Sequence, residues 1–481
     1  MKKAKLWALL IVLVLSLGLL SGCSQSEMGL INLMSEMNDM EVYESQETVD
    51  FEISGSAFAN NDPVAEAFIQ AMLSTYSLKS NMRVDTDQQV FDGTFSLADA
   101  KSGTEKQIFS FVASGDTIYI KVDDFVAFAK AFGNEQFDKQ LAVIGDTQYV
   151  SINTKEMARI MDPTGQVNNF NILNMKKQQT VYQNLMDGLS QEVFDEYETG
   201  MVKQNSKNKF TLKIDKPSVL NNIKPFMVYS INNAENINSF TKTFLGGLDA
   251  EELALLSMTP QTRTTAINEM TKMTDGLIAN RSLYLGQVDA IASSAKEGSA
   301  IVGDKTGLTL MVEKQGDQNF SQSADMDISI ADPDNLANNL HMAMKSTAQV
   351  KGIKTFSVTV PTSGIISWTD LEKRMPRVLK IDTAKQQYVL DQGLIFSSGA
   401  MDVHIVKGRT YLPVRTIGEA MNETVGWNSK IKQAYIVKNG KTINLAGDIF
   451  NSRAFIKIRD FEKLGYTVTW DKATKTAVLS Q

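Results

Sequence analysis

The chain has little of the material from which metal sites and histidine-based catalytic sites are built. Its 481 residues include one cysteine, Cys23, and two histidines, His341 and His404. One cysteine excludes an internal disulfide framework and a cluster of thiolate ligands. Two histidines leave little for a zinc site or a histidine proton relay. We therefore expect no catalytic residues, no metal site and no cofactor.

Proline is also scarce, with 9 residues, while 43% of the chain is hydrophobic and 21% is charged. This composition fits globular packing and excludes a disordered or collagen-like chain. At this length, two or three domains are expected.

The first 22 residues have the layout of a secretory signal peptide. Lys2, Lys3 and Lys5 precede an uncharged run over residues 6–20, which corresponds to a positive n-region and an apolar h-region. The run is shorter than the about 20 apolar residues that a membrane-spanning helix needs. Residues 1–22 are therefore predicted to be removed on export.

The residues that follow indicate how the exported chain is held. Leu20, Ser21, Gly22 and Cys23 resemble the lipobox of bacterial lipoproteins. The resemblance implies cleavage after Gly22 and a diacylglycerol on the sulfur of Cys23, with acyl chains such as palmitate. The protein is then expected on the outer side of the cell membrane, with residues 23–40 as lipidated cysteine and polar tether. The alternative is that Cys23 is an idle residue after an uncleaved anchor helix.

Signal removal also makes the protein more acidic. Loss of the three signal lysines lowers the formal net charge from −7 to −10. Because phosphate binding needs clustered Lys and Arg and no basic run occurs, no nucleic-acid partner is expected.

The C-terminal hundred residues contain a repeat, and self-similarity of this kind is a strong signal of architecture. The motif from Arg409 to Arg415 recurs from Arg453 to Arg459, 44 residues later, and Trp427 recurs as Trp470 after 43. Each copy is predicted as a strand, a helix and a strand, preceded by hairpins around Gly393 and around Asn439-Gly440.

Local signals suggest where these two helices begin and what covers them. Thr416 with Glu419 predicts a capping box, and Asp460 predicts a simple N-cap. Trp427 and Trp470 are expected to pack over the helices as core residues.

The first copy resembles a known family. Arg409, Tyr411, Pro413, Arg415 and Trp427 look like the motif of the copper amine oxidase N-terminal-like domain, also called the stalk domain. The family is common on secreted and surface proteins of Gram-positive bacteria. The resemblance covers residues 378–481 and includes Arg459 and Trp470 of the second copy. That copy departs from the pattern because Lys457 replaces Pro413.

The resemblance implies an accessory or interaction module that contacts the cell envelope or a protein. In the family this module lies outside the copper-bearing catalytic domain, so neither copper nor a quinone cofactor is implied. His404 is the one imidazole in this region, far short of a copper ligand set. We expect it to be a half-exposed strand residue.

The pattern between residues 41 and 361 predicts one large domain. Alternating apolar residues predict strands over residues 117–122, 210–214, 308–312, 324–330 and 356–360. Gly115 and Gly316 lie between paired runs and predict hairpin turns, so consecutive strands are expected to be antiparallel.

Helices are predicted among these strands. Apolar residues at helical spacing follow Asp62-Pro63 as far as Tyr76, and a second set of this kind runs from Tyr182 to Tyr197. Asp249 with Glu252 predicts a capping box, and Thr259-Pro260 a further helix start. The fold class is thus α+β, a large antiparallel-sheet domain packed with helices, a linker over residues 362–377, and a small α+β stalk-type domain.

The predicted sheet with helices on one face is similar to the half-barrel of lipoprotein carriers, in which apolar ligands bind. We read the protein first as a non-enzymatic surface lipoprotein whose stalk-type module contacts a cell-wall polymer or envelope protein. A carrier or sensor of a hydrophobic ligand is the second reading, and a hydrolase acting through carboxylates is the third.

Overall fold

The computed structural model describes most of the chain after residue 23. The described residues are 24–55, 73–99, 101–132, 143–153, 156, 175–256, 258–331, 339–375, 377–391, 396–438 and 440–480. Cys23, the other lipobox residues and the helix predicted after Asp62-Pro63 lie outside these ranges. The chain divides into two compact units, residues 1–125 with 151–363 and residues 126–150 with 364–481.

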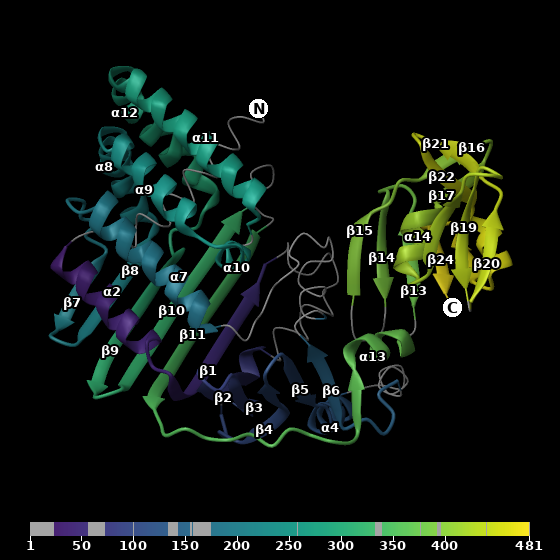
Figure 1. The fold of residues 1–481 in the computed structure, drawn as a ribbon, viewed down its shortest axis with the longest axis horizontal. Coiled ribbons are helices and arrows are strands. Elements are labelled where there is room, and N and C mark those ends of the chain that lie inside the picture. Colours follow the sequence, from purple (N-terminus) through teal and green to yellow (C-terminus); the bar gives the residue numbers. More distant parts are fainter. Residues whose placement is uncertain are drawn as a thin grey trace. The chain divides into compact units, whose positions relative to one another are not determined.

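The helices of the structure have the following bounds (Figure 1): α2 Gln25–Asn38, α4 Asp123–Phe132, α7 Met175–Gly188, α8 Lys216–Asn232, α9 Ala234–Gly247, α10 Ala250–Leu255, α11 Pro260–Ala279, α12 Arg281–Gly298, α13 Trp368–Arg374 and α14 Val414–Ala420. Short η1 Leu189–Val193, η2 Ser299–Ile301 and η3 Ile458–Leu464 complete them.

The first unit and its border contain the strands β1 Val42–Ser54, β2 Tyr76–Asp85, β3 Val90–Asp99, β4 Glu105–Ser114, β5 Thr117–Lys121, β6 Tyr149–Asn153, β7 Val202–Ser206, β8 Lys209–Asp215, β9 Gly307–Gly316, β10 Asn319–Ala331, β11 Asn339–Gly352 and β12 Ile365–Ser367. Within unit 1 their order is β5-β4-β3-β2-β1-β11-β10-β9-β8-β7. In this order, each pair of neighbouring strands is antiparallel. The α+β class with a large antiparallel sheet and helices is thereby confirmed.

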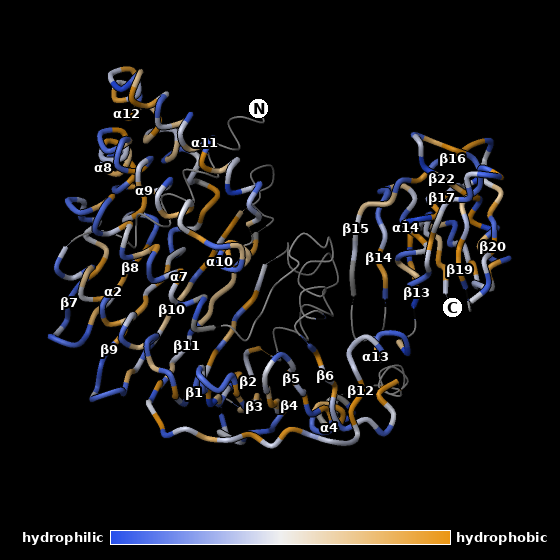
Figure 2. The backbone as a smooth tube through the Cα atoms, viewed as in Figure 1, coloured by the Kyte–Doolittle hydropathy of each residue, from blue (hydrophilic) through white to orange (hydrophobic). Residues whose placement is uncertain are grey.

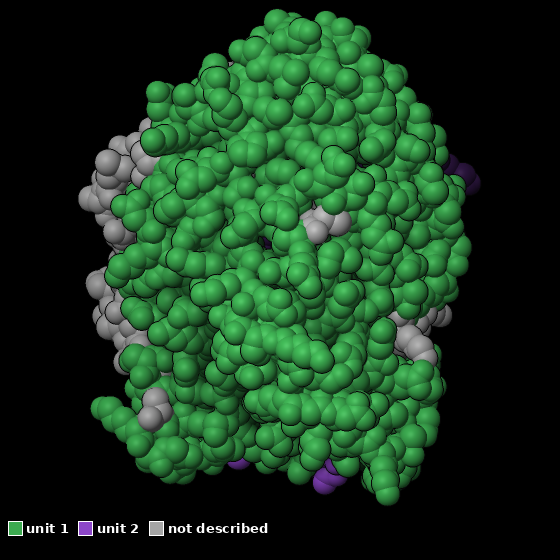
Figure 3. Space-filling model, turned by 90° about the vertical axis from the view of Figure 1, so that its left-hand side faces the viewer, with its two compact units in different colours: residues 1–125, 151–363 green, residues 126–150, 364–481 purple. Residues whose placement is uncertain are grey.

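The turn residues explain this succession of hairpins. Gly115, between β4 and β5, has φ of 63°, and Gln318, between β9 and β10, has φ of 52°. Positive φ is the conformation that tight hairpin connections require. The hairpins predicted at Gly115 and Gly316 are therefore confirmed. In a space-filling view, atoms of unit 1 cover nearly all of the side that faces the viewer (Figure 3).

Helix α2 replaces the polar tether predicted for residues 23–40, so that prediction was wrong. Ser24 caps the helix: its hydroxyl accepts from the Glu27 N–H, and its own N–H donates to the Glu27 carboxylate. Leu30 and Leu33 are buried with Phe210 and Phe320 of the sheet. An amphipathic stripe that gains such burial folds onto a sheet instead of remaining a tether.

A buried carboxylate fixes the start of α2 to the chain that leads into β7. Glu27 is 1% exposed and accepts from both the N–H and the hydroxyl of Thr199. Burial and the charge of Glu27 raise the pKa of Tyr197 to about 12. A buried charge of this kind is tolerated because its oxygens are hydrogen-bonded.

A second core lies under helices α8 and α9. Phe194, Tyr197 and Phe226 are buried there together, with the rings of Phe194 and Phe226 stacked 5.7 Å apart. The segment from Tyr182 to Tyr197, predicted to be helical throughout, is helical only as far as Val193, where η1 ends. Tyr197 is buried beyond the helix.

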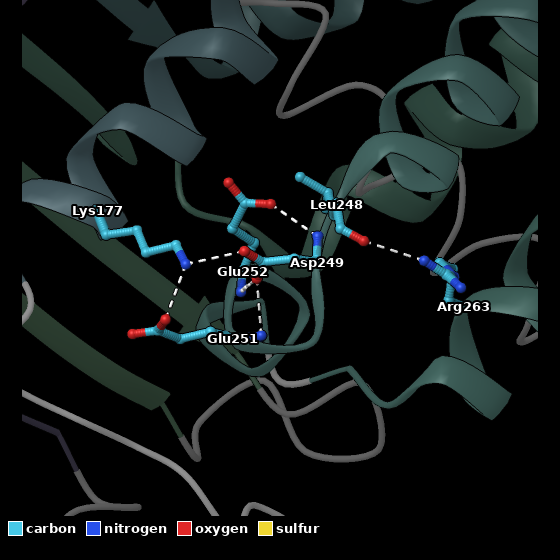
Figure 4. Close-up of polar contacts among 6 residues, drawn as sticks. All are labelled: Lys177, Leu248, Asp249, Glu251, Glu252 and Arg263. Carbon is cyan, nitrogen blue, oxygen red and sulfur yellow. Dashed lines mark hydrogen bonds and ion pairs between the residues drawn. The ribbon is translucent and has the colours of Figure 1, made fainter.

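The predicted start of α10 is confirmed and shows how neighbouring helices are joined. The Asp249 carboxylate accepts from the Glu251 and Glu252 N–H groups, and the Asp249 N–H donates to Glu252 (Figure 4). Lys177 of α7 pairs with Asp249 and Glu251 at 3.0 and 2.8 Å. Thr259 likewise caps α11, as predicted.

Three predictions around the large sheet were wrong. Residues 356–360 are not a strand, because β11 ends at Gly352 and the following residues make no ladder. Tyr76, expected at the end of a helix, begins strand β2. The linker expected over residues 362–377 contains β12 and helix α13, which Ser367 caps by accepting from the Asp370 N–H.

The C-terminal module, residues 378–481, is built from three small sheets. Its strands are β13 Val378–Asp382, β14 Gln387–Asp391, β15 Phe396–Ala400, β16 His404–Val406, β17 Arg409–Pro413, β18 Thr424–Asn428, β19 Gln433–Lys438, β20 Lys441–Leu445, β21 Asp448–Phe450, β22 Arg453–Lys457, β23 Thr467–Asp471 and β24 Thr476–Ser480. The sheets are β15-β14-β13-β24-β23, β16-β17-β22-β21 and β18-β19-β20, and one of the smaller sheets forms a half-barrel. Both predicted repeats are present, and β14 pairs with β15 and β19 with β20 as the predicted hairpins require. The turn residues Gly393 and Asn439 lie outside the described ranges.

One core holds the module together. Leu412, Ile417 and Phe461 are among its fully buried side chains, and Figure 2 shows hydrophobic residues along β13 and β19. The helix starts differ from the prediction. Helix α14 begins at Val414 without a side-chain cap, and Asp460 lies inside η3, where it pairs with Lys463. The strand passes directly into each helix, which leaves no separate capping position.

Candidate interaction groove of the C-terminal module

A groove of about 560 Å³ runs between the two repeats of the C-terminal module. One side is formed by the start of α14 and by strand β18, the other by the β21–β22 hairpin. Its lining comprises Pro413, Val414, Arg415, Thr416, Glu419, Val425, Gly426, Trp427, Ala434, Ile449, Ser452, Arg453 and Ala454. Three residues of the family motif, Pro413, Arg415 and Trp427, therefore meet in one cavity.

Trp427 is a surface residue, so its prediction as a core residue was wrong. It is 47% exposed, and its strand partner Ala434 is 5% exposed. Directly paired residues in an antiparallel sheet have their side chains on the same face. The indole thus covers the small alanine and presents the rest of its surface to the groove.

The groove also carries exposed positive charge. Arg415 is exposed and its Nε lies 4.0 Å from Glu419 Oε1, while Arg453 is exposed on the opposite wall. Residues 378–481 contain fifteen Lys and Arg against nine Asp and Glu, although the whole chain is acidic. A basic module of net charge +6 attracts anionic partners.

The other motif residues divide between core and surface. Tyr411 is 8% exposed and belongs to the sheet β16-β17-β22-β21. Arg409 and Arg459 are exposed, and Arg459 donates to Glu462 at 2.7 Å and to the Val468 carbonyl. Trp470 is 41% exposed, so the prediction that it packs as core was also wrong.

Sequence reasoning missed Ile449, Ser452 and Arg453 on the opposite wall of the groove. A charge count taken region by region, instead of over the whole chain, would have identified the basic module. Ile449, 54% exposed, carried no such signal, because an alternating strand pattern does not tell which face is covered.

A polar cluster elsewhere in the module ties the two repeats together. Tyr466 donates to Glu423 Oε1 at 2.9 Å, and the Lys438 ammonium lies 3.5 Å from the Tyr466 ring centroid. Burial lowers the pKa of Lys438, and burial together with Glu423 raises the pKa of Tyr466. The cation–π contact joins Lys438 of the first repeat to Tyr466 of the second.

His404 lies in strand β16, half-buried, as predicted. Its ring stacks on Phe450 at 4.4 Å and meets Phe455 edge-on at 4.8 Å. Within the described ranges, no group of three His, Cys, Asp or Glu side chains could hold a metal ion. The His404 ring thus packs among aromatic rings, with Asp402 Oδ1 3.3 Å from its Nε2.

A polar chain in unit 1 has the residue types of a hydrolase triad. His341 Nδ1 lies 3.4 Å from the Ser54 hydroxyl, and Nε2 lies 3.0 Å from Asp327 Oδ2. The strand register explains this grouping. On either side of His341 in β11, Ser54 of β1 and Ser329 of β10 lie directly opposite it. Asp327 lies two residues before Ser329 in β10, so it is a diagonal neighbour of His341. Serine catalysis also needs donors aimed at a developing oxyanion.

We expect Ser54 to be unreactive toward a fluorophosphonate probe. The sheet register alone accounts for the contacts of Ser54 with His341, so these contacts need no catalytic role to explain them. Mass spectrometry of probe-treated mature protein checks this. Labelling of Ser54 that disappears in His341→Gln would contradict a non-enzymatic protein.

Comparison with known proteins supports the C-terminal assignment. Residues 399–448 match the family model of the copper amine oxidase N-terminal domain. The match spans strands β16 to β20 with α14, which is the first repeat and most of the groove. The module is thus of the non-catalytic stalk type. No curated protein matches the chain. Among the described helices, none is long and apolar enough to cross a membrane.

Proposed function

We propose that this protein is a membrane-anchored extracellular lipoprotein, held by a diacylglycerol on Cys23, whose C-terminal module binds a cell-envelope polymer. The anchor is supported by the lipobox resemblance. The binding role is carried by one observation, the open groove in which a half-exposed tryptophan lies beside two exposed arginines. The protein acts by holding a partner and not by transforming it.

The groove suits an anionic polymer with sugar rings. A half-exposed indole offers a flat apolar face together with an N–H donor. Arginine forks match carboxylate and phosphate groups and bind them through paired hydrogen bonds. The remainder of the mature chain is strongly acidic, which confines attraction of a polyanion to residues 378–481.

Trp427→Ala is expected to lower binding of the mature protein to isolated anionic wall polymer at least tenfold. The reason is loss of the stacking face at the centre of the groove, where aromatic anchors contribute most. Co-sedimentation at two salt concentrations measures the effect. Val389→Ala, another exposed apolar position, serves as the control and should bind normally. Equal binding by both variants would exclude the groove.

A second candidate function, transport or sensing of a hydrophobic ligand, is favoured by a pocket in unit 1. Its volume is about 360 Å³, and apolar side chains of α2 and α7 form most of its wall, including Ile31, Met34, Tyr182 and Met186. This size lies in the range of small-ligand sites. Its two acidic lining residues are Glu27 and Asp187, and burial raises the pKa of Asp187. A neutral or cationic head group fits such a lining better than a fatty-acid carboxylate.

Met186→Trp is expected to fill this pocket and to reduce binding of the neutral probe N-phenyl-1-naphthylamine at least tenfold. In the wild-type protein, dodecyltrimethylammonium should displace the probe more effectively than laurate. Leu283→Trp, at a 58% exposed position on α12, is the control. If laurate were the better competitor, the charge assignment of the pocket would be wrong.

A further inference from the structure

We propose that the C-terminal module has a second binding surface, related to the groove by internal symmetry, and that the two together bridge two strands of an anionic polysaccharide. This inference rests on the proposed function, because it assigns a second site for the same polymer. The second surface consists of Trp470, Arg459 and Arg409, and is called the Trp470 surface below.

The strand register reveals the symmetry. Strands β17 and β22 pair antiparallel with Leu412 opposite Ile456, Tyr411 opposite Lys457 and Pro413 opposite Phe455. In the 44-residue repeat, Leu412 corresponds to Ile456, Tyr411 to Phe455 and Pro413 to Lys457. The pairing is therefore unchanged when the two repeats are exchanged. This is the property of a two-fold axis through the Leu412–Ile456 pair.

The hairpins outside this central pair obey the same relation. Trp427 pairs with Ala434, and Trp470 pairs with Ala477, each an alanine that is buried beneath its tryptophan. The turns also agree. Asn428 accepts from the Lys430 N–H, and Asp471 accepts from the Ala473 N–H. Identical local geometry therefore places both indoles at equivalent positions.

Exposure repeats along with geometry. Trp427 and Trp470 are 47% and 41% exposed, and Ile449 of the groove corresponds to Ile405, which is 64% exposed. The groove arginines Arg415 and Arg453 correspond to Arg459 and Arg409, and all four are exposed. A core role would hide the tryptophans, and one binding site would need only one set. Both sets remain at the surface.

The two sites differ in charge in a direction that favours a polyanion. Pro413 of the groove corresponds to Lys457, and Glu419 corresponds to Lys463. Lys463 is paired with Asp460, and Arg459 with Glu462. Against two basic and one acidic side chain in the groove, the Trp470 surface carries four basic and two acidic side chains, a net charge of +2. Its polymer binding should fall more steeply with salt.

Symmetry determines how a polymer can occupy both sites. A two-fold axis through an antiparallel strand pair stands perpendicular to the sheet. A polysaccharide lying along the surface in one site must therefore run in the opposite direction in the other. A stiff chain that has a direction does not turn back within the width of one small module. Two strands then bind to one module, and the module links them.

The stoichiometry of a short anionic glycan tests this arrangement in the complete mature protein. Titration calorimetry with hexagalacturonate should give two sites per chain in the wild type and in Val389→Ala. Trp427→Ala and Trp470→Ala should each retain one site, and the double variant none. With long polygalacturonate, light scattering should rise for the wild type and stay at baseline for either single variant.

Different failures identify different errors. One site in the wild type, lost in Trp427→Ala and unaffected by Trp470→Ala, would overturn the second surface while leaving the proposed function intact. No binding by the wild type would overturn both. Equal binding of a single-stranded oligonucleotide of matched charge would overturn the polysaccharide assignment. Circular dichroism of each variant verifies that the sheets remain folded.

Discussion

Cys23→Ser is expected to abolish incorporation of labelled palmitate into the protein completely. Cys23 is the one cysteine in the chain, so no other thiol can accept a diacylglycerol. Two acyl chains hold a protein stably at a bilayer, because each buried methylene contributes about 0.8 kcal/mol. The variant should also retain its signal peptide and migrate as a larger species. Metabolic labelling followed by gel electrophoresis measures both effects.

Ser21→Ala is the matched control for the lipobox. It preserves a small residue before the cysteine and should label as the wild type does. A Cys23→Ser protein that still carries palmitate would show that the anchor lies elsewhere, and the lipoprotein assignment would then be wrong.

Phe455→Ala is expected to destabilise the C-terminal module by about 3–5 kcal/mol, the range for removing a buried aromatic side chain. Phe455 is fully buried at the centre of the sheet β16-β17-β22-β21. Since whole domains are stable by only about 5–15 kcal/mol, this loss brings the module close to unfolding. The three tryptophans after the predicted signal, Trp368, Trp427 and Trp470, all lie within residues 364–481. Tryptophan fluorescence in urea therefore reports on this unit within the complete protein.

Trp470→Ala provides the comparison, because it removes a larger ring from the same repeat. Its position is 41% exposed, so we expect a loss within about 1 kcal/mol, typical of surface substitutions. If Trp470→Ala were as damaging as Phe455→Ala, the indole would be a core residue after all. The binding surface built on it would then be excluded.

The repeat made the C-terminal module the most predictable part of the chain. Two copies of one pattern identified the strands, both short helices and the hairpins, because alternation and helical spacing recur at matched positions. The caps were wrong since Thr416 and Asp460 have the right residue types for a position that this fold does not contain. Strand and helix join directly at Val414 and at Ile458.

The tryptophans could not be assigned from the sequence. Large aromatic residues are usually buried, but their exposure depends on what lies across the sheet. Here the tryptophans lie on the edge strands β18 and β23, and their partners are small alanines, Ala434 and Ala477, which leave the outer part of each indole uncovered. The groove itself needs residues from both repeats, and such a meeting of distant segments is visible only in the folded chain.

Helix α2 was missed although its signals were present. Ser24 and Glu27 form a capping box, and Leu30, Leu33, Met34 and Met37 follow at helical spacing. The prediction of a tether followed the polar and Met-rich composition of the segment and did not use the helical spacing of its apolar residues. The carboxylate bonds of Glu27 to Thr199 join residues far apart in sequence, and no local pattern announces them.

We propose that the protein holds the membrane at one end of the chain and an anionic polysaccharide at the other. Cells expressing the full chain can be labelled with palmitate, treated with a cross-linker, and separated under denaturing conditions into lipid and wall-polymer fractions. Palmitate-labelled wild-type protein should be recovered with the polymer. Protein carrying both Trp427→Ala and Trp470→Ala should keep its label and remain in the lipid fraction. An identical distribution of the two proteins would contradict polymer binding through these tryptophans.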